Sequence, residues 1–384
     1  MYDFDYDYLT LIKSETEKQP PEYPLNICIK SACGCFLTDT DGKQYLDLTS
    51  NMECQPFGYS DKAVDDGSFF YNSGLFISNQ DVELAKDLCD ATGLSKAFFT
   101  SSQAGCYQIL NTIIENHANT HLKNKVLISS TDLNRDKYII GADNAEYIPL
   151  NHDSLAKSLF TKSVSAVIVE IAQINDGIKQ ANTDYLCLLK ELCDKNDAML
   201  VFDASNISPL RLGVGLFNYD LSIKPDVLLL SKGLSNGIPF GAVVVSDRVQ
   251  DNFSQGNFKF HNENFLSLAY KHASKFVKPQ FRDELADIIQ KNADYIEKAL
   301  NDLSDNHISI GNICRYGMMF TVNVDISAYD LVGECLSHGI IIEALNPSAI
   351  KLSPPYVIGK REIDELVNTL DLLLDKLATY DRLN

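Results

Sequence analysis

The sequence lacks an apolar run long enough to cross a membrane, for which about 18 consecutive apolar residues are needed. Its N-terminal segment, MYDFDYDY, is acidic and lacks the basic region and the apolar core of a signal peptide. Positive charge is also scarce, because 33 Lys and Arg stand against 52 Asp and Glu, a net charge of −19. Such a surface disfavours nucleic acid and anionic membranes as partners. We therefore expect a cytoplasmic protein whose partners are small molecules.

Paired cysteines are few. The ten cysteines are scattered along the chain. Cys33 and Cys35 form the one close pair in the sequence, and a zinc site of the usual kind needs a second pair or nearby histidines. We predict no metal site.

Hydrophobic residues, by contrast, make up 45% of the 384 positions. This is enough for a large core divided between two domains or between a domain and a lobe.

The most informative stretch is DVLLLSKGLSNGIPFGAVVV, residues 226–245. It predicts a short apolar strand, a lysine where that strand ends, a loop with Gly and Pro, and a second apolar strand. A lysine at the edge of an apolar wall loses hydration, which disfavours its charged form and lets the neutral amine attack a carbonyl. Lys232 is therefore a candidate Schiff-base lysine.

A second apolar segment delivers a carboxylate in the same way. Residues 198–202, AMLVF, predict a strand that ends at Asp203. The carboxyl ends of parallel strands meet at the edge where open α/β folds bind ligands, so Asp203 and Lys232 are expected to converge there. In an enzyme that uses pyridoxal 5'-phosphate (PLP), such a carboxylate keeps the pyridine nitrogen protonated so that the ring acts as an electron sink.

The Asp203–Lys232 pair, its spacing and the loop GIPFGA at 237–242 resemble the class III aminotransferases, closest to acetylornithine and ornithine aminotransferases. The resemblance extends from about Gly34 to the C-terminus. It implies the α/β fold of type I PLP-dependent transferases, with a mostly parallel sheet of the seven-stranded type. It also implies a large PLP-binding domain over residues 61–274, and a small α+β lobe built from residues 1–60 and 275–384. The family's active site is shared within a homodimer, which we expect here too.

A phosphate site is predicted where residues 96–100, a strand, lead through a turn into a helix over 107–118. A small-residue turn that opens a helix offers free backbone N–H groups and the positive end of the helix dipole. Ser102, Gln103 and Ala104 are the candidates. The family carries Gly-Thr at this turn, so backbone donation survives here but the threonine hydroxyl does not.

Four further positions match cofactor contacts of the family. Glu170 ends the predicted strand 165–170, and the family's glutamate lies near the phenolic oxygen of PLP. Asn206 stands where the family has a glutamine that donates to that oxygen, and it can donate from a side chain one methylene shorter. Leu133 and Asn134 follow a strand at 126–130, at the place where the family has an aromatic residue that stacks on the cofactor.

The substrate positions depart from the family pattern. Asp136 falls where the family's arginine takes the substrate carboxylate, and Arg135 lies one place away. Lys351 stands at the family's last conserved arginine, before the Ser-Pro-Pro turn. Asn175 replaces the glutamate that forms a gate with that arginine in ornithine-type enzymes. Arg135 and Lys351 are the candidate substrate contacts, although a displaced cation loses the paired geometry that guanidinium offers a carboxylate.

The resemblance implies a PLP-dependent aminotransferase. It would transfer an amino group from an amino acid or ω-amine, of the acetylornithine or ornithine kind, to a 2-oxo acid. Lys232 would serve first as the imine partner and then as the base that moves a proton. Two alternatives stay open: a PLP enzyme of the same fold with another reaction, such as a racemase, an epimerase or another amine transaminase, and a non-catalytic relative.

Overall fold

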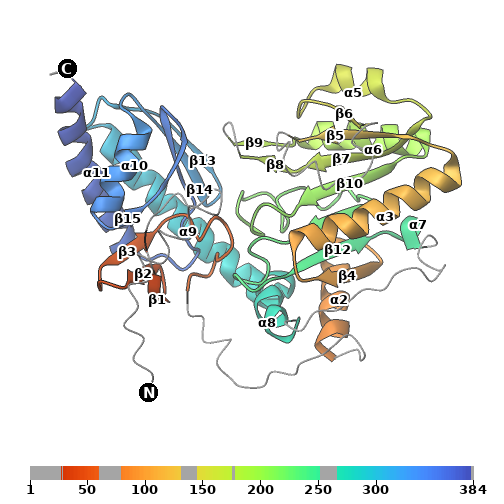
Figure 1. Cartoon of the computed structure of the whole chain (residues 1–384), viewed down its shortest axis with the longest axis horizontal. Helices are drawn as coiled ribbons and strands as arrows, with labels where there is room; N and C mark the ends of the chain where they lie inside the picture. Colours follow the sequence, from red (N-terminus) through yellow and green to blue (C-terminus); the bar gives the residue numbers. More distant parts are fainter. Residues whose placement is uncertain are drawn as a thin grey trace, which may run out of the picture.

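The computed structural model describes residues 27, 29–59, 79–130, 145–174, 178–250 and 266–381. In this part of the chain a large sheet with its helices lies on one side, and the C-terminal strands and helices lie on the other, beside the N-terminal strands (Figure 1). None of the helices described has the length and apolar character needed to cross a bilayer.

A seven-stranded sheet is the centre of the larger half. Its strand order is β4-β12-β11-β10-β7-β5-β6. β12 runs antiparallel to both of its neighbours, and each adjacent pair from β11 to β6 is parallel. This is the mostly parallel α/β sheet that was predicted. The strands are β4 Lys96–Thr100, β5 Lys125–Ser129, β6 Ala145–Tyr147, β7 Val164–Glu170, β10 Met199–Ala204, β11 Val227–Leu230 and β12 Gly241–Val245.

The central strands are buried over their whole length because both faces of the sheet are covered. Every residue of β7, β10, β11 and β12 is buried, as is typical of parallel strands covered on both faces. Alternate residues point to opposite faces. In β10, Val201 packs in one apolar cluster and Phe202 in the other. Asp203 therefore shares a face with Val201, and that face is covered by α3.

Different helices cover the two faces of the seven-stranded sheet. α3 and α7 supply residues such as Ile113 and Val249 to the cluster that includes Val201. α2, α5, α6 and α8 contribute to the larger cluster on the opposite face. The bounds are α2 Asn79–Thr92, α3 Gln103–His121, α5 Asp153–Leu159, α6 Thr183–Asn196, α7 Asp247–Gln250 and α8 Leu266–Val277.

Helix α3 begins earlier than predicted. The sequence predicts a helix over 107–118, but α3 starts at Gln103. Ser102 is its N-cap, and the Ser102 hydroxyl accepts a hydrogen bond from the backbone N of Gly105 at 3.1 Å. This cap allows the helix to begin at residues 103–106, whose composition is typical of a loop. The turn predicted to bind phosphate is thus the first turn of α3.

The smaller half contains two four-stranded sheets. One has the order β1-β2-β3-β15, and the other has the order β13-β14-β17-β16. A separate pair, β8–β9, follows β7 and lies with the larger half (Figure 1). The strands are β1 Ile29–Cys33, β2 Phe36–Asp39, β3 Gln44–Asp47, β8 Ala172–Gln173, β9 Lys179–Gln180, β13 Ile310–Tyr316, β14 Met319–Val324, β15 Ile340–Ile341, β16 Glu343–Asn346 and β17 Ala349–Leu352, and the helices are α9 Pro279–Ser304, α10 Ala328–Ser337 and α11 Lys360–Asp381.

Near the N-terminus, β2 and β3 form an antiparallel hairpin. β3 also pairs in parallel with β15, which brings the hairpin against the C-terminal segment. Figure 1 shows β2 and β3 beside β15 and α10, although these elements are almost 300 residues apart. The pairing joins segments near the two ends of the chain. The domain limits at 60/61 and 274/275 stay a prediction.

A buried ion pair ties three distant segments together. Arg211, which is 0% exposed, donates from Nε to Glu53 Oε2 at 2.8 Å. Its Nη1 donates to the backbone oxygen of Pro354 at 2.7 Å, and its guanidinium lies 4.4 Å from the ring centroid of Tyr356. The N-terminal, central and C-terminal parts of the chain therefore meet at this arginine.

Candidate active site

The parallel strands bring three predicted site residues to one edge of the sheet. Glu170 ends β7, Asp203 lies in the last pair of residues of β10, and Lys232 follows β11 by two positions. β10 lies between β7 and β11. The backbone N of Lys232 donates to the backbone oxygen of Ser205 at 2.9 Å, so the lysine segment is fastened to the chain just beyond Asp203. The Lys232 side chain is half-buried.

Asp203 is a buried carboxylate, 2% exposed. The hydroxyl of Tyr107 donates to its Oδ2 at 2.7 Å. The backbone N of Ser205 donates to its Oδ1 at 3.0 Å, and the Ser205 hydroxyl donates to the same oxygen. Tyr107 reaches Asp203 because α3 covers the face of the sheet to which Asp203 points. These donors compensate for the water that the carboxylate loses on burial.

A chain of side-chain hydrogen bonds links the start of α3 to β7. Gln103 Nε2 donates to Asn206 Oδ1 at 2.6 Å and to the Ser205 hydroxyl at 2.7 Å. Asn206 Nδ2 in turn donates to Glu170 Oε1 at 3.0 Å. The Ser130 hydroxyl donates to Glu170 Oε2 at 3.0 Å. Gln103, Asn206 and Glu170, each predicted from sequence as a cofactor contact, thus lie together beside Asp203.

The N-terminus of α3 adjoins the same network. Ser102 and Ala104 are exposed, and Gln103 is half-buried because its side chain turns toward Asn206. The first N–H groups of a helix and the positive end of its dipole favour an anion. The edge of the sheet therefore carries an amine, a buried carboxylate, an amide and a helix N-terminus.

Comparison with known families decides what kind of protein has this edge. Residues 137–374, more than half of the chain, match the family model described as Aminotransferase class-III. The chain belongs to the class III aminotransferases. These are PLP-dependent transaminases, so the predicted family, fold class and enzyme class are confirmed.

This class III aminotransferase is similar in sequence to acetylornithine aminotransferases. The acetylornithine aminotransferase of Methanocaldococcus jannaschii is 25% identical over 376 residues, covering 90% of this chain and 93% of the relative. The acetylornithine aminotransferase of Bacillus subtilis is 26% identical over 371 residues, covering 90% of this chain and 94% of the relative. The similarity runs through nearly the whole of each protein.

Solved structures share the fold. N-acetylornithine aminotransferase from Stenotrophomonas maltophilia superposes with a TM-score of 0.81 at 19% identity, covering 96% of this chain and 100% of that one. The ornithine aminotransferase of Toxoplasma gondii, crystallised with PLP at partial occupancy in its active site, gives 0.83 at 18% identity, covering 99% and 97%. The architecture is thus kept where most residues differ.

The residues at the sheet edge fit the cofactor of the family. PLP offers an aldehyde, a ring nitrogen, a phenolic oxygen and a phosphate. A half-buried amine, a buried carboxylate, an amide and a helix N-terminus are groups suited to these four features, and Lys232, Asp203, Asn206 and the first turn of α3 would supply them. The orientation of Asp203 and Asn206 is already fixed by hydrogen bonds.

The remaining predicted contacts with cofactor and substrate lie partly outside the described residues. Leu133, Asn134 and Arg135 lie outside the described residues, as does Asn175. Lys351 lies on β17 and is 5% exposed. Its Nζ is 2.7 Å from Glu343 Oε2, on the adjacent strand β16. The amine is therefore paired with a carboxylate of its own chain.

Two residues that contact Asp203 are absent from the sequence-based list. The sequence did not predict Tyr107 or Ser205 as site residues. A tyrosine within an apolar helix is usually a core residue, and a serine beside Asn206 has no distinctive pattern. The spacing of four residues between Gln103 and Tyr107 could have indicated Tyr107 as a site residue, because residues at i and i+4 share one helix face. No pattern in the sequence pointed to Glu53, whose backbone oxygen would lie 2.9 Å from a Cβ added at Gly233, next to Lys232.

Cys54 is a further neighbour of Lys232. Burial raises the pKa of the Cys54 thiol, and the charge of Glu53 adds to this, while the positive charge of Lys232 acts in the opposite direction. The thiol therefore lies within electrostatic reach of the lysine amine. At neutral pH it is a protonated, weakly polar group beside Lys232.

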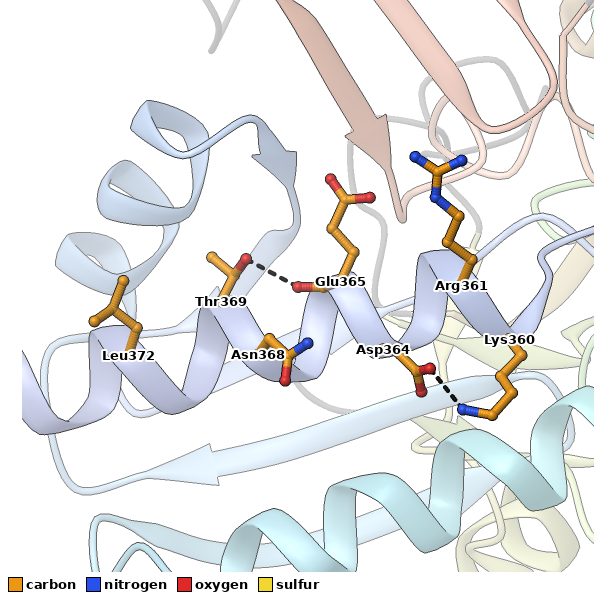
Figure 2. A pocket seen from close by; sticks show the side chains of 7 residues that line it. All are labelled: Lys360, Arg361, Asp364, Glu365, Asn368, Thr369 and Leu372. Carbon is orange, nitrogen blue, oxygen red and sulfur yellow. Dashed lines mark hydrogen bonds and ion pairs between the residues drawn. The ribbon is translucent and has the colours of Figure 1, made fainter.

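A surface hollow of about 690 Å³ lies along α11. Its walls, shown in Figure 2, come from a single helix, and Lys360 pairs with Asp364 within it at 2.6 Å. None of the predicted site residues that the structure describes lines this hollow. Its lining is Lys360, Arg361, Asp364, Glu365, Asn368, Thr369 and Leu372. Paired charges spaced along one helix are typical of a solvated face and do not form a catalytic group.

One cluster of the described residues has ligand types suited to a metal ion. Side-chain atoms of His117, His121 and Asp197 lie within 4.8 Å of one another, at the end of α3 remote from Gln103. Arg248 Nη2 lies 2.5 Å from Asp197 Oδ1, so a guanidinium already meets this carboxylate. The cluster joins α3 to the turn before β10. The sequence-based expectation of no metal site stays a prediction.

Proposed function

We propose that this aminotransferase binds PLP at the carboxyl edge of its seven-stranded sheet and transfers an amino group from an amino acid or ω-amine to a 2-oxo acid. The observation that carries the proposal is the fastening of Lys232 to Ser205, which brings the lysine segment beside the buried Asp203 carboxylate. The curated relatives, which are named acetylornithine aminotransferases, support a donor of the acetylornithine or ornithine kind.

Each residue at the edge has a separate task. When bound, PLP supplies an electron-withdrawing ring that stabilises negative charge on the substrate carbon. Lys232 would hold the cofactor through its Nζ and, once released, would take and return a proton at the same atom. Asp203 would keep the ring nitrogen protonated. Asn206 would donate to the phenolic oxygen, with Glu170 beside it, and the first turn of α3 would hold the phosphate.

We propose that two cations of the chain recognise the substrate. Arg135 and Lys351 are the proposed contacts for substrate carboxylates, and Leu133 and Asn134 the proposed contacts on the cofactor ring. Because Lys351 is paired with Glu343, a substrate carboxylate has to share or replace that partner. We also propose a homodimer with a shared active site, supported by the family resemblance. The cytoplasmic location stays a prediction of the sequence.

Absorption spectra of the purified protein test the proposal. With PLP added, the wild type should show a visible band that survives gel filtration, and Lys232→Ala should lose it, because only an amine at that position retains the aldehyde. Lys195→Ala, an exposed lysine on α6, is the matched control and should keep the band. A colourless wild type at saturating PLP would refute the proposal.

Substrate tests then separate the reaction classes. Adding ornithine or N-acetylornithine with 2-oxoglutarate should change the spectrum and yield glutamate. Interconversion of L- and D-amino acids without any 2-oxo acid product would instead favour a racemase. A spectrum that no amine changes, in a protein that retains PLP, would favour the non-catalytic relative.

A further inference from the structure

Helix α3 presents two polar side chains to the site from one face. Gln103 and Tyr107 are one turn apart, and both point to the end of β10 and the residues just after it. Tyr107 is 2% exposed, and its hydroxyl lies 2.7 Å from Asp203 Oδ2. A phenol at the end of a rigid ring, carried by a packed helix, has little freedom to move. It therefore fixes the plane of the carboxylate from an element other than the one that carries Asp203.

Gln103 does the same for Asn206. The Asn206 amide is held at both ends, since Oδ1 accepts from Gln103 and Nδ2 donates to Glu170. These opposite roles determine which end of the amide is oxygen and which is nitrogen. An amide nitrogen carries two N–H groups, so donating one to Glu170 leaves a second for another acceptor. Without Gln103, the short side chain of Asn206 has one anchor in place of two.

We propose that Tyr107 and Gln103 are positioning residues, which set Asp203 toward the ring nitrogen and Asn206 toward the phenolic oxygen before the cofactor enters. This inference rests on the proposed function. In this role the two α3 side chains act through Asp203 and Asn206 and do not touch the cofactor themselves. Orienting both groups beforehand reduces the loss of side-chain freedom on binding, and so tightens binding.

Binding of a cofactor analogue tests the role of Tyr107. The analogue 4'-deoxypyridoxine 5'-phosphate lacks the aldehyde, so its affinity reports the non-covalent contacts without Lys232. In equilibrium dialysis, Tyr107→Phe should raise the Kd roughly tenfold, the usual scale for a lost hydrogen bond to a charged group. The matched control is Tyr219→Phe, which removes the same hydroxyl from another buried tyrosine, 2% exposed and packed on Phe202 of β10. Its Kd should equal that of the wild type.

A double-mutant cycle separates positioning from general damage. If Tyr107 acts through Asp203, adding Tyr107→Phe to Asp203→Asn should change the Kd by less than about twofold, because the group being oriented is already altered. Additive effects, or equal Kd values for Tyr107→Phe and Tyr219→Phe, would overturn the inference while leaving the proposed function intact. A wild type that binds neither the analogue nor PLP would refute the proposed function, and the inference with it.

Gln103 provides an independent arm. Gln103→Leu keeps the volume and removes the amide, and it should raise the Kd of the analogue roughly threefold to tenfold. Gln108→Leu, at an exposed position of the same helix, should leave it unchanged. Because Gln103 is half-buried, this arm also serves if Tyr107→Phe fails to fold. Equal Kd values for the two glutamine variants would remove Gln103 from the proposal.

Discussion

At the scale of single residues, the buried carboxylate of Asp203 is the proposed partner of the cofactor's ring nitrogen. Its oxygens accept from Tyr107 and Ser205, which are neutral donors. Neutral donors orient the carboxylate without cancelling its charge, and the charge is what stabilises a protonated ring nitrogen.

Replacing Asp203 by Asn should therefore separate cofactor uptake from turnover. A neutral amide still accepts a hydrogen bond but stabilises a protonated ring poorly, so PLP should be retained while kcat falls by about 100-fold or more. Turnover at saturating PLP measures this. Asp184→Asn, on the exposed first turn of α6, should match the wild type. A kcat near normal in Asp203→Asn would refute the assignment.

The buried Glu53–Arg211 pair makes a different prediction. Glu53→Ala leaves the guanidinium of the fully buried Arg211 without its partner, so the free energy of unfolding should fall by about 3–5 kcal/mol. Urea denaturation measures the loss. Glu334→Ala, which breaks the half-exposed pair with Lys376, should lower it by about 1 kcal/mol or less. Equal losses in the two variants would show that Arg211 finds another partner or water.

His117 gives the molecule a pH dependence of known sign. Burial lowers the pKa of this imidazole, and the charge of His121 adds to the effect, although the backbone oxygen of Asp197 opposes it. The folded pKa thus lies below the unfolded value of 6.5. The contribution of His117 to stability is therefore complete above pH 6.5 and is lost as pH falls toward the folded pKa.

The test compares the wild type with His117→Gln. In urea unfolding at pH 7.5 and 5.5, the wild type should lose more stability on acidification than the variant, because the variant has no imidazole to protonate at this site. The other titratable groups nearby, including His121 and Asp197, are common to both proteins. Parallel pH profiles would contradict the prediction.

At the scale of elements, the sequence predicted strands better than helix ends. β7, β10, β11 and β12 are apolar except at Ser165, Glu170 and Asp203, and their composition predicts strands because no helical periodicity competes. The start of α3 was missed because Ser, Gln, Ala and Gly in succession are typical of a turn. The Ser102 cap and packing against the sheet extend the helix instead.

Ser102→Ala should therefore loosen the first turn of α3. Loss of the side-chain cap is expected to lower the free energy of unfolding by about 1 kcal/mol. It should also weaken PLP binding, since the same turn is the proposed phosphate site. Ser102→Asp, which can cap but adds a negative charge, should keep the stability and still weaken PLP binding. Thermal unfolding and the Kd for PLP measure the two effects separately. Unchanged stability in Ser102→Ala would contradict the role of the cap.

At the scale of the whole molecule, the site lies where three parts of the chain meet. β3 pairs with β15, Arg211 links Glu53 to Pro354, and Glu53 abuts Gly233 beside Lys232. A ligand bound at this junction stabilises the folded chain over the unfolded one.

Saturating PLP should therefore raise the stability of the protein. At a concentration 100 times the Kd, the gain is about 2.7 kcal/mol, visible as an increase in Tm. Lys232→Ala should show a smaller gain at the same PLP concentration, because its affinity for the aldehyde is lower. Pyridoxine, which lacks both the aldehyde and the phosphate, is the control ligand. Equal Tm values with and without PLP in the wild type would contradict binding at this junction.

The sequence by itself determined the sheet, its class and the ends of its strands. Short apolar runs rich in Val, Ile and Leu and bounded by polar or turn residues favour strands covered on both faces, and the polar residue that ends such a run falls at the ligand edge. Glu170, Asp203 and Lys232 follow from this local rule. Only the tertiary structure decided that Tyr107 holds Asp203, that Gln103 holds Asn206, and that Lys351 is paired with Glu343. These contacts join residues that are distant in the chain or on separate elements, and they depend on the packing of those elements, which no local pattern encodes.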